Sequence, residues 1–211
     1  MKYIDEQYSN ICFNDIADTM AKSGRFEHRI DNHLNHNELA DIQQFTKKHM
    51  IHWSLTTKWL NFNAHKEPTS NKHTKDVSWK IKTSTNTLPT LDILNRNYPN
   101  LIRNRTNCLL CNSQTETNQH IWQCPNLIPD IRSTFLLLLE DLPPSEDAIL
   151  LIRSYVTQDL YHIFKVHFNT QKEANRALMA FLQLSLQLIK LNVWKKRSVI
   201  WKQWKLSQGT I

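Results

Sequence analysis

Apolar residues recur along most of this chain at spacings of three and four, the period of an amphipathic helix. Between Asn37 and Leu60 they fall roughly on one face, which predicts a single helix. A shorter helix is expected from about Asn14 to Ser23, where Gly24 would end it. Another is expected from Asp76 to Thr87, with Pro89 beyond its end. The first half of the chain therefore predicts helices joined by polar connectors.

Longer helices are predicted in the second half of the chain. A short helix capped by Thr90 is expected to run through Asn95, and another is expected from Asn126 to Leu142. Two long helices, about Ser145 to Phe168 and Lys172 to Leu206, complete the pattern. The stretch from Asn61 to Lys75 is almost devoid of large apolar residues, which is typical of a mobile linker.

Composition narrows the fold class. Only two glycines occur among the 211 residues, which excludes glycine-rich phosphate-binding loops and argues against a fold of tight β-hairpins. The predicted class is mainly α, with bundle-like helical segments and little or no sheet. The apolar stretch from Ala177 to Trp194 contains Gln183 and Lys190, which would be costly in a bilayer, and Met1 opens no secretory signal. We therefore expect an intracellular protein, nuclear or cytoplasmic, without a membrane partner.

The chemistry is concentrated in four residues with the spacing C-x2-C-x8-H-x3-C: Cys108, Cys111, His120 and Cys124. Two cysteines separated by two residues can bind one ion from a single turn, and a distant histidine and cysteine can complete a tetrahedral Zn²⁺ site. Two other interpretations stay open, a degenerate metal-free module and a disulfide, although three cysteines would leave one unpaired. Cys12 lies far from this set and is expected to be a small buried hydrophobic residue.

Positive charge gathers at the carboxy-terminal end. The segment from Gln171 to Leu206 carries a net charge of +7, which equals that of the whole chain. Interleaved lysines and tryptophans could bind a phosphate backbone and stack on bases, but the same spacing suits a helix that packs its tryptophans on the protein. The candidate nucleic-acid contacts are Arg96, Arg103 and Arg105 before the cysteine pair, and Lys195, Lys196, Arg197, Trp201, Lys202, Trp204 and Lys205 in the tail.

Further motifs surround the proposed ligands. In chain order they are Trp79-Lys80-Ile81-Lys82, Leu88-Pro89-Thr90, Arg96, Cys108-x2-Cys111, Glu116-Thr117, His120-Ile121-Trp122 and Cys124-Pro125. Over about Trp79 to Arg132 this series resembles the reverse transcriptase zinc-binding domain of non-LTR retrotransposon polyproteins. The resemblance implies that Cys108, Cys111, His120 and Cys124 bind Zn²⁺.

A shorter resemblance lies near the amino terminus. Asn14 to Lys22 is similar to the helix that ends a type 1 ribonuclease H domain, in which the aspartate matching Asp18 is the last of four metal-binding carboxylates. Two-metal cleavage needs several carboxylates that converge on the ions, and Asp18 alone cannot hold them. We therefore expect no enzymatic activity, whereas the parent polyprotein would carry reverse transcriptase and ribonuclease H.

These observations predict four segments: a ribonuclease H terminal-helix remnant at 1–24, a helical connector and linker at 25–75, a zinc-binding domain at 76–132 and a helical basic tail at 133–211. The expected function is zinc-dependent binding of RNA or an RNA:DNA hybrid, without catalysis. Two alternatives stay open. One is a structural or protein-interaction module in which zinc holds helices together and the carboxy-terminal helices contact a protein partner. The other is an inactive retroelement relic.

Overall fold

The structure, a computed structural model, describes residues 40–65, 67, 70–136 and 146–207. By its internal contacts the chain divides into two compact units, residues 1–44 and 45–211. Of the first unit, residues 40–44 are described, and they form the beginning of helix α4. The helix predicted from Asn14 to Ser23 lies outside the described residues.

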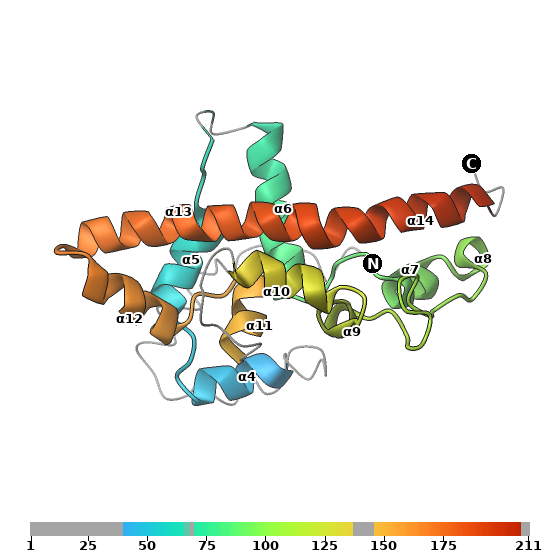
Figure 1. The fold of residues 1–211 in the computed structure, drawn as a ribbon, viewed down its shortest axis with the longest axis horizontal. Helices are drawn as coiled ribbons and strands as arrows, with labels where there is room; N and C mark the ends of the chain where they lie inside the picture. The colour runs from blue at the N-terminus through green and yellow to red at the C-terminus, as the bar shows by residue number, and fades with distance from the viewer. Residues whose placement is uncertain (1–39, 66, 68–69, 137–145, 208–211) are drawn as a thin grey trace, which may run out of the picture. The chain divides into compact units, whose positions relative to one another are not determined.

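The described residues confirm the mainly α class, because they form helices and two isolated β-bridges but no sheet (Figure 1). The helices are α4 (Ala40–Lys47), α5 (Trp53–Asn61), α6 (Asn71–Ser84), α7 (Leu91–Asn97), α8 (Pro99–Ile102), α9 (Asn118–Gln123), α10 (Ile128–Leu136), α11 (Glu146–Ile152), α12 (Gln158–His167), α13 (Gln171–Ile189), the π-helix η1 (Lys190–Trp194) and α14 (Lys195–Ser207).

Helices α13, η1 and α14 follow one another without a break, so residues 171–207 form one long helix (Figure 1). Its start is capped by Thr170, whose Oγ1 accepts a hydrogen bond from the backbone N–H of Glu173 at 3.2 Å. The long terminal helix predicted from Lys172 to Leu206 is thus confirmed. By length and composition alone this helix could cross a membrane, but 44% of its apolar window is buried in the fold.

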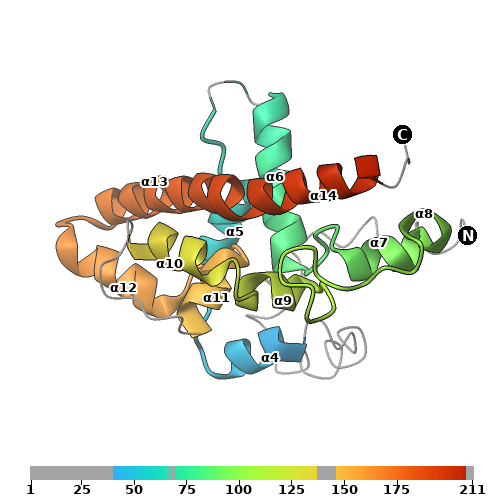
Figure 2. The same cartoon turned by 45° about the vertical axis from the view of Figure 1, so that its right-hand side comes forward.

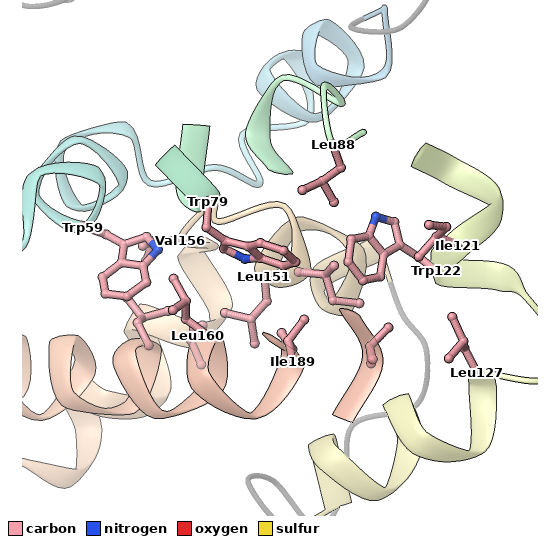
Figure 3. Packing of buried hydrophobic residues seen from close by; sticks show 14 of the residues in the cluster. Trp59, Trp79, Leu88, Ile121, Trp122, Leu127, Leu151, Val156, Leu160 and Ile189 are labelled. Atoms are coloured by element: carbon pink, nitrogen blue, oxygen red, sulfur yellow. The ribbon is translucent and has the colours of Figure 1, made fainter. Parts of the chain in front are cut away.

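The core of the second unit lies along the buried side of α13 and η1 (Figure 3). Three tryptophans from different helices, Trp59, Trp79 and Trp122, are buried in this core. Leu151 of α11 and Ile189 of α13 pack with them. Described residues of the second unit from the predicted segments 25–75, 76–132 and 133–211 therefore contribute to one hydrophobic core, and the burial of its large side chains supplies the main stabilising term.

Two predicted long helices are each interrupted, so the predictions of unbroken helices at Asn37 to Leu60 and Ser145 to Phe168 were wrong. The interruptions pair with each other through an antiparallel bridge between Ile51 and Thr157. The backbone N–H of His52 donates to the carbonyl of Val156 at 2.7 Å, and that of Gln158 donates to Met50 at 2.8 Å. Each break thus supplies the backbone partners that the other one needs.

Helix α6 begins earlier than predicted and shortens the expected linker. It starts at Asn71 rather than Asp76, because the Oγ of Ser70 accepts a hydrogen bond from the backbone N–H of His73 at 3.1 Å. The predicted linker from Asn61 to Lys75 is therefore partly helical. In contrast, the helix expected from Asn126 to Leu142 is described as α10 as far as Leu136, and residues 137–145 lie outside the described part.

Helix α6 crosses the long terminal helix near η1 in both views (Figures 1 and 2). The crossing is held by the edge-to-face contact of Trp79 and Trp194, whose ring centroids lie 5.5 Å apart. Next to it, the Nζ of Lys190 donates to the buried carboxylate of Asp76 at 2.8 Å. The π-helical turn of η1 thus lies where the two helices meet.

Candidate metal centre

The four predicted ligands come from a turn and a short helix. Cys108 and Cys111 lie in a turn in which the backbone N–H of Asn112 donates to the carbonyl of Cys108 at 2.8 Å. Asn112 has a φ of 54°, which asparagine tolerates better than most residues. His120 lies in α9, and Cys124 caps the end of that helix. A turn and a helix end therefore present all four side chains to one point.

The polar loop between the two ligand pairs is ordered by its own hydrogen bonds. Asn107 and Thr115 form an antiparallel bridge, and the backbone N–H of Cys108 donates to the carbonyl of Gln114 at 2.8 Å. At the end of the loop, the Oγ1 of Thr117 caps α9 by accepting from the backbone N–H of His120 at 3.0 Å. Backbone hydrogen bonds of the protein itself therefore form a small hairpin in this loop.

The geometry of the four ligand atoms suits a tetrahedral metal ion. The Sγ atoms of Cys108 and Cys124 lie 3.9 Å apart, the Sγ of Cys111 lies 3.3 Å from the Nε2 of His120, and all four atoms lie within 4.8 Å of one another. Zinc–sulfur bonds of about 2.3 Å at tetrahedral angles place two sulfurs about 3.8 Å apart. The cluster could therefore hold a metal ion, and its donor set is compatible with zinc.

The three thiols differ in pKa. Burial raises the pKa of Cys108 to about 12, and burial also raises the pKa of Cys124. Burial pushes the pKa of Cys111 upward too, but hydrogen bonds, chiefly those from the side chain and the backbone of Ser113, outweigh it and lower that pKa to about 6. Because metals bind thiolates, an ion that enters this site must displace protons from the two buried thiols.

Two polar side chains orient the ligands from behind. The Oε1 of Gln114 lies 2.9 Å from the Nδ1 of His120. Because a carbonyl oxygen accepts, Nδ1 carries the hydrogen and Nε2 presents its lone pair to the centre of the cluster. The Oγ of Ser113 donates to the Sγ of Cys111 at 3.1 Å. Sequence reasoning missed both residues, since a polar loop residue carries no signal of what it contacts.

A buried carboxylate connects the cluster to the terminal helix. The side chain of Glu116 is fully buried, and its Oε1 accepts from the Nε of Arg197 at 3.1 Å and from Nη2 at 2.5 Å. The same carboxylate accepts from the backbone N–H of Leu91 at 3.0 Å and from that of Leu109, inside the cysteine turn, at 3.5 Å. Glu116 thus joins α7, the cysteine turn and α14.

The Leu88-Pro89-Thr90 motif is held by a second buried residue, Asn118. The Oδ1 of Asn118 accepts from the backbone N–H of Leu88 at 3.0 Å, and its Nδ2 donates to the carbonyl of Leu88 at 3.1 Å. Nδ2 also donates to the Oγ1 of Thr90 at 3.0 Å. The motif before α7 is therefore fixed directly to the helix that carries His120.

The predicted nucleic-acid contacts of α14 differ in their exposure to solvent. Arg197 is only 2% exposed and pairs with Glu116, so its guanidinium faces the protein interior, and the prediction that it contacts nucleic acid was wrong. Lys196 is exposed and pairs with Asp130 at 2.6 Å. Lys195 and Lys202 are exposed on α14. Burial of Arg197 follows from helix geometry, which turns one residue of every three or four toward the core.

The remaining tail residues form an aromatic and cationic surface with one arginine of the metal-binding module. The rings of Trp201 and Trp204 stack with centroids 5.1 Å apart and an interplanar angle of 21°. The guanidinium of Arg105 lies 5.5 Å from the ring centroid of Trp204, and the Nζ of Lys205 lies 5.7 Å from that of Trp201. We call Arg105, Trp201, Lys202, Trp204 and Lys205 the Arg105–Trp204 surface.

Arg96 and Arg103 lie in the segment of α7 and α8 that precedes the cysteine pair. Arg96 is exposed in the last turn of α7, and Arg103 is exposed just after α8, with a φ of 54°. Asp18 lies outside the described residues, so the ribonuclease H remnant stays a prediction.

Comparisons of the chain with protein-family models, curated proteins and solved structures found no match.

Proposed function

We propose that this chain is a zinc-binding, nucleic-acid-binding module of the kind found in non-LTR retrotransposon polyproteins, and that it contacts RNA or an RNA:DNA hybrid without catalysis of its own. Three thiolates and one imidazole are common ligands of structural Zn²⁺. Because all four tetrahedral positions would be taken by Cys108, Cys111, His120 and Cys124, no position would be left for a reactive water. The ion would therefore order the module.

The contact between Arg105 and Trp204 carries this proposal. Arg105 lies three residues before the first zinc ligand, and its Nη2 donates to Asn112 of the cysteine turn at 3.4 Å. Its Nε is buried, so any phosphate contact is left to the terminal nitrogens of the guanidinium, which lies over the indole of Trp204. One surface thus combines the metal-binding loop with the basic helix.

Charge and stacking on this surface fit a nucleic acid. Lysine and arginine attract phosphates, and aromatic rings stack on unpaired bases. The indoles of Trp201 and Trp204 are half-buried, so part of each ring is accessible. Lys202 is exposed on α14, and Lys205 lies near Trp201. The two kinds of side chain therefore lie close enough to contact the backbone and the bases of one strand.

The test is binding of the zinc-loaded protein to a fluorescently labelled single-stranded RNA and to an RNA:DNA hybrid at several salt concentrations. We expect Arg105→Gln/Lys202→Gln to reduce the slope of log K against log salt by about 1.4, since each lost phosphate contact on a single strand contributes about 0.7. The matched control is Lys165→Gln/Lys172→Gln, which removes the same charge from exposed positions on α12 and α13. Absence of salt-dependent binding would contradict the proposal.

A structural role is the second candidate, and one observation favours it. Cys108 and Cys124 are fully buried members of the same hydrophobic core as Leu178 and Leu182 of α13. In this case zinc would hold the helices together, and α14 would contact a protein. An apolar interface responds little to salt, so the same titration separates the two functions.

A further inference from the structure

A second concave surface lies at the crossing of α6 and η1, apart from the Arg105–Trp204 surface. It is an open groove of about 330 Å³, which is at the small end of the range for ligand sites. Side chains of α6 line one side, and residues from beyond α6 and from η1 line the other; the main ones are Lys75, Ser78, Trp79, Lys82, Pro89 and Trp194. Among the described residues, no acidic side chain lines this groove.

Lysines form a stripe along the groove. Lys72, Lys75, Trp79 and Lys82 are separated by three, four and three residues, so they share one face of α6. The stripe rises about 15 Å along the helix, at 1.5 Å per residue. The three lysines are exposed, and none has an ion-pair partner in the part of the chain that the structure describes.

The one acid of α6 does not offset this charge. Asp76 is buried, and its carboxylate accepts from Lys190 at 2.8 Å, from His65 at 3.0 Å and from Gln183 at 3.1 Å. Burial favours the neutral acid, but these three hydrogen bonds outweigh it and hold the pKa of Asp76 below its ordinary value. Partners inside the fold therefore already compensate the negative charge of Asp76. This carboxylate does not cancel the positive charge of the lysines along the groove.

Aromatic rings form the floor of the groove. Trp194 is half-buried at the end of η1, and Trp79 is 8% exposed with its ring edge-to-face against Trp194. Single π-helical turns are rare and often occur at functional sites. Here η1 carries both Trp194, which lines the groove, and Lys190, which neutralises Asp76. An indole between lysines can receive the face of a base while the lysines contact its phosphates.

We propose that this groove binds a nucleotide of a single-stranded nucleic acid, with its base against Trp194 and its flanking phosphates at Lys75 and Lys82. The inference rests on the proposed nucleic-acid function and adds a second contact to the Arg105–Trp204 surface. A paired base would keep its face in the duplex stack, so the groove should select an unpaired strand. Lys72 extends the contact to a further phosphate.

The experiment measures binding of the zinc-loaded, full-length chain to a labelled uridine oligonucleotide and to an abasic phosphodiester of equal length. The groove variant is Lys75→Gln/Lys82→Gln, and the control of equal charge is again Lys165→Gln/Lys172→Gln. All four lysines are exposed, so both variants should fold, which circular dichroism and zinc content would verify. We expect the groove variant to bind the uridine strand about tenfold more weakly than the control, with a salt slope lower by about 1.4.

The outcomes separate this inference from the proposed function. If the unaltered chain shows no salt-dependent binding, the proposed function fails and the groove assignment fails with it. If the unaltered chain binds but the groove variant matches the control, only the groove assignment is overturned. Equal affinity for the abasic and uridine strands would overturn the contact between the base and Trp194. A preference for the uridine strand that is smaller in the groove variant than in the control supports this contact, because the Arg105–Trp204 surface is the same in both variants.

Discussion

At the scale of single residues, side chains that donate to or accept from the ligands orient them toward the metal position. Gln114 fixes which nitrogen of His120 faces the cluster, and Ser113 donates to the thiol of Cys111. Neither residue could be recognised as part of the site from the sequence, because their partners are set by the hairpin of the loop. The ligands themselves were recognisable, because their spacing alone limits the chemistry.

Replacement of Gln114 by leucine should weaken zinc binding by about tenfold to a hundredfold, the usual effect of losing a hydrogen bond behind a metal-bound histidine. Competition with a chromophoric chelator measures the affinity. Gln119→Leu is the matched control, because Gln119 is exposed on α9 beside His120. An affinity of the Gln114 variant equal to that of the control would show that His120 is oriented without this bond.

Lys80 is fully buried and should make stability depend on pH. Its Nζ donates to the carbonyls of Trp59 and Phe62 at 2.9 Å each, and burial lowers its pKa to about 8. The unfolded chain holds this proton up to about pH 10.4, so the free energy of unfolding should rise with pH between about 8 and 10.4.

Urea unfolding across this range should give a flatter pH profile for Lys80→Met. The exposed neighbour variant Lys82→Met should keep the steeper profile, and equal profiles would contradict the prediction.

At the scale of elements, the contact between Glu116 and Arg197 makes α14 part of the metal-binding module. Removal of one partner from a buried ion pair leaves the other charge without compensation, which costs about 3–5 kcal/mol. Arg197→Met should therefore lower the free energy of unfolding by about that amount. Lys196→Met, which breaks the exposed pair with Asp130, should cost about 0–1 kcal/mol. Equal losses in urea unfolding would mean that the buried pair does not couple α14 to the module.

The helices show what periodicity can and cannot predict. The long helix from Gln171 was predictable because buried apolar residues recur at helical spacing from Ala174 to Val193 of η1. The breaks at His49 and Ser154 were not, because both residues take a positive φ that nothing local requires, 55° and 64° respectively. Each break is stabilised by the backbone of the other, about a hundred residues away in sequence. Only the tertiary pairing explains them.

At the scale of the second unit, the metal site and the hydrophobic core are continuous. Cys108 and Cys124 are buried within the core that α13 organises, and Glu116 ties the cysteine turn to α14. Zinc should therefore stabilise the whole unit as well as the loop, since any ligand that binds only the folded state stabilises it. Addition of a chelator should lower the unfolding temperature monitored by circular dichroism at 222 nm, and re-added zinc should restore it. An unchanged unfolding temperature would mean that the ion is not coupled to the fold.

The central claim is tested most directly by elemental analysis of zinc in the purified chain, beside Cys108→Ser/Cys124→Ser and the control Cys12→Ser. We predict about one zinc per chain for the unaltered protein and for Cys12→Ser, and none for the double variant, since four ligands bind one structural ion. A chain that holds no zinc after purification in its presence would contradict the account, and so would a double variant that keeps the ion.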